Sequence, residues 1–197
     1  MKIAFLASHG GSNMQAILDG CQDGSIAAQP ALLICNNPKA GAIERAKGSD
    51  MPVVILNGKT HTDENELDTA ILQALQNAKA EIIILAGYMK KIGPRVLKTF
   101  DNRILNIHPA LLPKFGGQGM YGMNLHKAVI AAAESESGAT VHLINAVYDE
   151  GPILQQARVP VFPDDSPESL QARVLEQEHR LYPDTIAKIA RGEIKLP

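Results

Sequence analysis

The stretch Lys2-Ile-Ala-Phe-Leu-Ala-Ser-His-Gly-Gly-Ser-Asn13 decides the fold of this chain. Residues 2–7 form a short, mostly apolar run that is typical of a buried strand, and the glycine pair after it predicts a tight turn. A helix is predicted from Ser12 to Gln22, directly after that turn. A strand, a glycine turn and a helix in succession are the first unit of a layered α/β protein.

The same alternation of apolar runs and helical stretches continues along the chain. Strands are predicted at residues 31–35, 53–56, 82–86, 104–107, 141–144 and 153–161, and helices at 40–47, 64–79, 125–133 and from Pro167 onward, with Ser166 as N-cap and a break or kink at Pro183. The run 82–86 is the most apolar and is predicted to be central. The pattern predicts a single α/β domain over residues 1–197, with a doubly wound, mostly parallel, Rossmann-like sheet and helices on both faces.

Composition excludes several functional classes. The formal net charge is -2 and no basic stripe is present, so a nucleic-acid partner is not expected. Cys21 and Cys35 are the only cysteines, which predicts neither a disulfide framework nor a cysteine-based zinc site and favours a reducing cytoplasm. The apolar run Ile3–Ala7 is too short for a signal peptide or a membrane span, so no membrane partner is expected.

The stretch Arg103-Ile-Leu-Asn-Ile-His-Pro-Ala-Leu-Leu-Pro113 carries the strongest sign of chemistry. Alternation along a strand places Asn106 and His108 on the same face, just before two prolines end regular structure. An amide donor and a titratable imidazole side by side can stabilise an oxyanion and move a proton. A structural histidine held by a nearby carbonyl is the competing interpretation.

Three separate regions lie at the carboxyl ends of predicted strands: residues 8–13, 87–89 and 106–108. In doubly wound sheets the ligand crevice lies outside these ends, so the three regions are expected to meet there. The turn Gly11-Ser12-Asn13 before a helix predicts a phosphate-binding site. The alternative is a plain tight turn in which Ser12 is the N-cap of the helix. The turn lacks the Walker A sequence and the dinucleotide fingerprint, which favours a mononucleotide or sugar phosphate.

Two further residues have open roles. Asp149, in Asp-Glu-Gly-Pro152, is either a turn-forming residue or a carboxylate that orients His108 or raises its pKa. His142 either lines the site or is a sheet residue. A metal site built from these residues and His126 is not expected, because no tight ligand spacing is present. The glycine-rich loop 116–122 is interpreted as a mobile flap rather than a plain surface connection.

Six motifs together give a family resemblance over essentially the whole chain: Gly11-Ser-Asn13, Leu85-Ala-Gly-Tyr-Met89, Asn106-Ile-His-Pro-Ala-Leu-Leu-Pro113, Gly138-Ala-Thr-Val-His142, Asp149-Glu-Gly-Pro152 and Gln177-Glu-His179. The set resembles the folate-dependent phosphoribosylglycinamide formyltransferase family. The resemblance implies transfer of a formyl group from the co-substrate 10-formyltetrahydrofolate to the amine of glycinamide ribonucleotide, a step of purine biosynthesis. It implies these two small molecules as partners, no metal, and a monomer or homodimer.

The resemblance also implies site roles. Asn106, His108 and Asp149 match the catalytic residues; Gly11, Ser12, Asn13 and Glu178 match the nucleotide site; Leu85, Met89, Lys90, Lys91, Ile92, Asn106, His142 and Val147 match the folate site. Without the resemblance, Glu178 would be a solvated helix charge and the apolar residues would be core. Glu64 and Leu175 depart from the family pattern, and the Gly119–Gly122 segment lengthens the flap.

Two other functions compete with this interpretation. A 10-formyltetrahydrofolate hydrolase would use the same three catalytic residues with water as acceptor, but hydrolases of this kind carry an added N-terminal domain, whereas this sequence begins at its first strand. A non-catalytic nucleotide-phosphate binding protein is the second alternative. The intact set Asn106, His108 and Asp149 argues against it.

Overall fold

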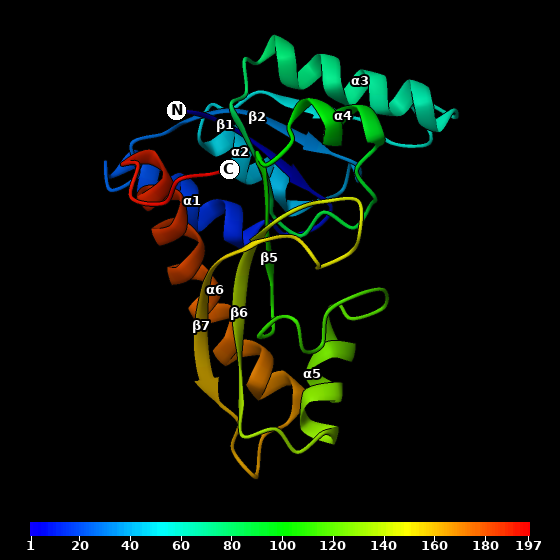
Figure 1. Cartoon of the computed structure of the whole chain (residues 1–197). Helices are drawn as coiled ribbons and strands as arrows, with labels where there is room; N and C mark the ends of the chain where they lie inside the picture. Colours follow the sequence, from blue (N-terminus) through cyan, green and yellow to red (C-terminus); the bar gives the residue numbers. More distant parts are fainter.

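The computed structural model describes all residues from Met1 to Pro197. Its elements are β1 (Lys2–Ala7), α1 (Ser12–Gln22), β2 (Gln29–Cys35), α2 (Gly41–Gly48), β3 (Val53–Ile55), α3 (Glu64–Asn77), β4 (Ile82–Leu85), α4 (Pro94–Thr99), β5 (Ile104–His108), α5 (Met123–Ala131), β6 (Glu136–Leu143), β7 (Ile153–Pro160) and α6 (Pro167–Ala190). The strands form one sheet in the order β3-β2-β1-β4-β5-β6-β7. Figure 1 shows β5, β6 and β7 side by side. The β4 strand is central, as predicted.

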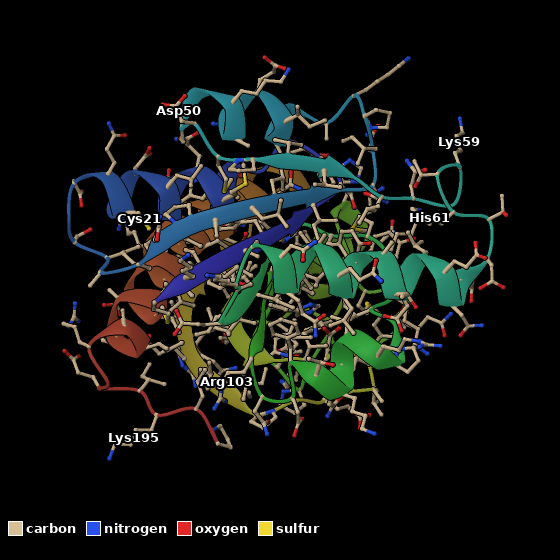
Figure 2. The ribbon with its side chains drawn as sticks, turned by 90° about the horizontal axis from the view of Figure 1, so that it is seen from above. Cys21, Asp50, Lys59, His61, Arg103 and Lys195 are labelled. Atoms are coloured by element: carbon tan, nitrogen blue, oxygen red, sulfur yellow. The ribbon has the colours of Figure 1, made fainter.

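The sheet is parallel from β3 to β5 and antiparallel from β5 to β7. Helices α1, α2, α5 and α6 contribute buried residues to the core on one face, and α3 and α4 to the core on the other. Figure 2, viewed from above, shows the strands between these two layers. The predicted doubly wound, mostly parallel architecture is therefore confirmed. No helix combines the length and apolar composition that crossing a membrane requires.

Helix α4 is absent from the sequence-based prediction. Its six residues follow Gly93, and the buried Asp68 carboxylate of α3 accepts hydrogen bonds from the backbone N–H groups of Arg95 (2.8 Å) and Val96 (3.3 Å). A Cβ on Gly93 would lie 2.1 Å from Asp68 Cγ, so glycine is required there. The cap comes from a side chain more than 20 residues away, which no local pattern reveals.

Two other predictions need correction. Strand β6 begins at Glu136 rather than Val141, because its antiparallel pairing with β7 continues to the pair formed by Glu136 and Pro160. Of the predicted break or kink at Pro183, the break is wrong, because helix α6 continues through this residue to Ala190. Buried residues on both sides of the proline, including Tyr182 and Ile186, pack both halves of the helix against the core, which offsets the lost backbone hydrogen bond. Ser166 caps α6 as predicted, accepting from Ser169 N–H at 3.2 Å.

Candidate active site

A cavity of about 750 Å³ lies at the carboxyl edge of β4 and β5. Asn13, Gly87–Met89 and Asn106–His108 all line it, so the three predicted regions do meet at one edge. The remaining walls come from the β5–α5 and β6–β7 connections, including residues 117–122 and 144–149. Both connections project from the same side of β5 and β6 (Figure 1). The volume suits a small organic molecule.

The amide of Asn106 is oriented by a buried histidine. Antiparallel pairing of β5 and β6 places Asn106 opposite His142. His142 Nδ1 lies 3.0 Å from the Leu143 carbonyl, which only accepts, so Nδ1 carries the hydrogen and Nε2 accepts from Asn106 Nδ2 at 3.2 Å. Burial lowers the pKa of His142, which favours this neutral form. The second amide hydrogen of Asn106 remains available to a ligand.

His108 and Asp149 both line the cavity and face each other. His108 Nδ1 lies 3.6 Å from Asp149 Oδ2, and the side chains are 5% and 13% exposed. The second carboxylate oxygen, Oδ1, lies 3.6 Å from His142 Nε2. Asp149 has a left-handed backbone (φ 59°), a conformation that aspartate adopts more readily than most residues. The sequence separates these groups by about 40 positions, and the β6–β7 connection brings them together.

The glycine turn presents the start of α1 to the same edge. Gly11 is left-handed (φ 70°), and a Cβ there would lie 2.8 Å from Ala42 Cβ, so only glycine fits. Gly11, not Ser12, is the N-cap, and no side chain caps the helix. The first N–H groups of α1 are therefore available to an anion. Asn13 lines the cavity, whereas Gly11 and Ser12 lie beside it.

Glu178 is buried at 7% exposure and lines the same cavity. Asn13 Nδ2 donates to its Oε2 at 2.6 Å, which connects α6 to the glycine turn. Burial raises the pKa of Glu178 to about 7, against the opposing effect of the Asn13 hydrogen bond. Composition alone had suggested a solvated charge. The spacing from Val174 to Glu178 to Tyr182, all buried, is the helical signal that places Glu178 on the inward face.

Comparison with known proteins gives the family. The formyl transferase family matches residues 1–186. A phosphoribosylglycinamide formyltransferase from Haemophilus influenzae is 41% identical over 195 residues, covering 99% of this chain and 90% of that protein. This chain belongs to the phosphoribosylglycinamide formyltransferase family.

Solved structures agree with this assignment. The formyltransferase fold superimposes on glycinamide ribonucleotide transformylase 1 from Symbiobacterium toebii with a TM-score of 0.93 at 36% identity, covering 100% of this chain and 91% of the other. It also superimposes on a formyltetrahydrofolate deformylase from Pseudomonas syringae with a TM-score of 0.88, covering 100% of this chain and 63% of the other. That protein is only 19% identical, which shows a shared fold and nothing further.

The predicted folate-site residues of the formyltransferase mostly line the cavity. The cavity is lined by Leu85, Met89, Lys90, Lys91, Ile92, Asn106 and Val147. His142 is instead fully buried behind Asn106. The sequence-based prediction missed Ser8, a buried residue whose Oγ accepts from Met89 N–H at 2.8 Å and so ties the end of β1 to the 87–89 turn. It also missed Tyr121 and Tyr148, two half-exposed aromatic residues on the cavity wall.

The alternative metal site is not formed by these residues. No group of three or more histidine, cysteine, aspartate or glutamate side chains is arranged to hold an ion. His126 of α5 is buried and does not line the cavity. Its burial lowers its pKa.

Proposed function

We propose that this protein transfers the formyl group of 10-formyltetrahydrofolate to the amine of glycinamide ribonucleotide, yielding formylglycinamide ribonucleotide and tetrahydrofolate for purine biosynthesis. One observation carries the proposal: Asn106, His108 and Asp149 share one cavity with the start of α1 and with the apolar residues of the 85–92 segment. The cavity thus combines groups suited to acyl transfer, an anion-binding site and an apolar surface. The names of the relatives support the choice of glycinamide ribonucleotide as acceptor and of a formyl group as the unit transferred.

The nucleotide is assigned to the glycine turn. Free N–H groups at the start of α1 and the positive end of its dipole favour a phosphate dianion, and the first turn of α1 itself contains no acidic residue. Gly11, Ser12 and Asn13 would hold the phosphate. Glu178, next to Asn13, would accept hydrogen bonds from ribose hydroxyls. This arrangement would direct the glycinamide amine toward His108.

The formyl donor is assigned to the wall opposite the glycine turn. Leu85, Ile92 and Val147 offer apolar surface for a flat heterocycle, with Met89 at the rim, 44% exposed. Lys90 and Lys91 are exposed at the same rim and are suited to carboxylates on the donor's tail. The donor supplies the formyl carbon. His142 acts indirectly, by orienting Asn106.

The side chains then have distinct roles in transfer. The neutral amine attacks the formyl carbon, and the carbonyl oxygen gains negative charge. Asn106 stabilises that charge by a hydrogen bond. Protonated His108 stabilises it through its positive charge, because its Nε2 faces the Phe115 carbonyl and its Nδ1 faces Asp149. One hydrogen-bond donor of this kind contributes roughly a hundredfold to a thousandfold in rate. Asp149 stabilises the imidazolium by its charge and accepts, through water, the proton that the amine loses. The new bond joins amine nitrogen to formyl carbon, and the donor nitrogen leaves with a proton. Proton transfer of this kind contributes roughly a hundredfold to ten-thousandfold.

The experiment is incubation of the purified protein with 10-formyltetrahydrofolate, with and without glycinamide ribonucleotide. The proposal predicts tetrahydrofolate and formylated nucleotide in equal amounts, and only when nucleotide is present. Formate released without nucleotide would indicate the hydrolase alternative, and no reaction with intact binding would indicate a non-catalytic protein. We further propose a cytoplasmic location, consistent with the free thiols of Cys21 and Cys35.

A further inference from the structure

The main chain that enters the glycine-rich loop contacts both titratable groups of the active site. His108 Nε2 lies 2.8 Å from the carbonyl oxygen of Phe115. Two residues later, the N–H of Gly117 donates to Asp149 Oδ2 at 2.9 Å. Both contacts are shorter than the 3.6 Å between His108 Nδ1 and Asp149 Oδ2. Three consecutive residues therefore hold the imidazole and the carboxylate at their present separation.

The Phe115 carbonyl determines where the imidazole carries its protons. A carbonyl oxygen only accepts, so Nε2 of His108 carries a hydrogen in both the neutral and the charged ring. In the neutral ring Nδ1 then carries no hydrogen. Two hydrogen-bond acceptors, Nδ1 and Asp149 Oδ2, face each other and repel. A proton on Nδ1 removes this repulsion and converts it into an attraction between opposite charges.

We infer that the main-chain segment Phe115–Gly117 is a positioning element that makes Nδ1 of His108 the nitrogen that gains and gives up the proton, and that holds the Asp149 carboxylate in line with it. The inference deepens the proposed function and rests on it for the identity of the reaction. It assigns a role to a segment that contributes no side chain to the chemistry. The glycine-rich loop beyond Gly117 is then anchored at its start to the reacting groups.

Glycine at position 116 is what allows this approach. A Cβ there would lie 3.2 Å from Asp149 Cβ and 2.7 Å from Leu112 Cδ2. The first contact would push the segment away from the carboxylate, and the second involves only the end of a side chain. Gly117 has a φ of 93°, which favours glycine as well, although a Cβ there would meet nothing within 4 Å. Gly116 is thus the position where added volume is transmitted to Asp149.

Three titratable groups surround the ring from neighbouring elements. They are Asp149 from the β6–β7 connection, His142 from β6 and His126 from α5. Burial lowers the pKa of both His142 and His126, which favours the neutral form of each ring. The carboxylate of Asp149 is therefore the charge that a proton on Nδ1 would meet.

The first test is the tautomer of His108, read from two-bond ¹H–¹⁵N spectra of the ¹⁵N-labelled protein without substrate, with the signals assigned by comparison with His108→Gln. The inference predicts that Nε2 keeps its hydrogen throughout the pH titration while Nδ1 alone changes state. A neutral ring with hydrogen on Nδ1, or a mixture like that of free imidazole, would overturn it. Because no substrate is needed, this result is separate from the success or failure of the proposed function.

The second test is Gly116→Ala, with Gly58→Ala as control, because a Cβ at Gly58 meets nothing within 4 Å. A displacement of the reacting groups by a fraction of an ångström to about 1 Å predicts a loss in kcat on the order of tenfold to a hundredfold, an altered pH profile and a nearly unchanged nucleotide KM. Adding Leu112→Val removes the contact with Leu112 Cδ2. If that addition restores full activity, the loss came from packing and the inference fails; if the loss persists, it acts through Asp149.

Discussion

Replacement of Asp149 by asparagine removes one charge and leaves the shape of the site nearly intact. The amide oxygen of the new side chain can still accept from the N–H of Gly117. At the 3.6 Å separation from His108 Nδ1, opposite charges attract by roughly 4–5 kcal/mol at an effective dielectric constant of about 20. Part of this attraction is offset by the cost of burying both groups, because neither side chain is more than 13% exposed.

We therefore expect Asp149→Asn to lower kcat more than nucleotide affinity. Removing the charge that stabilises the imidazolium and the group that accepts the amine proton predicts a fall in kcat of about a thousandfold, within the range of general acid–base catalysis. The nucleotide KM should change by less than about threefold, since the glycine turn and Glu178 are untouched. Steady-state kinetics with both substrates varied separates the two parameters.

The matched control is Glu150→Gln, which removes the same charge from the neighbouring, exposed residue. It should leave kcat within about twofold of the original protein, as is usual for exposed sites without partners. Weakened nucleotide affinity with normal turnover in Asp149→Asn would refute the reasoning. An equal loss in Glu150→Gln would refute it too, because the effect would then reflect net charge near the cavity and not a specific contact.

Three other predictions concern stability. Burial raises the pKa of Glu178 from 4.5 to about 7, so the contribution of this group to the free energy of unfolding falls as pH rises from 4.5 to 7. Measured by urea unfolding, the free energy of unfolding of Glu178→Gln relative to the original protein should therefore rise by up to about 3 kcal/mol between about pH 4 and pH 8. A pH-independent difference would contradict this. Gly11→Ala should lower the free energy of unfolding by about 2–4 kcal/mol, because Gly11 has a left-handed backbone and an added Cβ would overpack against Ala42. Gly10→Ala, whose Cβ would meet nothing within 4 Å, should lower it by about 1 kcal/mol or less. Equal losses in the two variants would contradict the close fit described for Gly11. Tyr182→Phe should cost about 1–2 kcal/mol by leaving the Leu105 carbonyl without its 2.9 Å partner, and an unchanged urea midpoint would show that the bond contributes nothing.

Much of the fold followed from local sequence. The apolar runs are continuous and the glycine turn sits at a strand end, so β1, α1 and β4 were predicted within one or two residues of their observed bounds. What local sequence could not supply were features that depend on distant residues. Helix α4 is capped by Asp68, and β6 is lengthened by its pairing with β7.

The site followed the same rule. Asn106 and His108 could be paired from strand alternation alone, because both lie in one strand. Their joining with Asp149 depended on the family resemblance, since a turn aspartate about 40 positions away has no local mark of function. The contacts of Phe115 and Gly117 were beyond prediction for a different reason: they are made by main-chain atoms, which every residue has.

The most direct test of the proposed site is a crystal structure with glycinamide ribonucleotide bound. We expect the phosphate at the first N–H groups of α1, the ribose beside Glu178, and the amine directed at the space between Asn106 and His108. A nucleotide bound elsewhere, or one whose amine points away from these two side chains, would contradict the proposed roles.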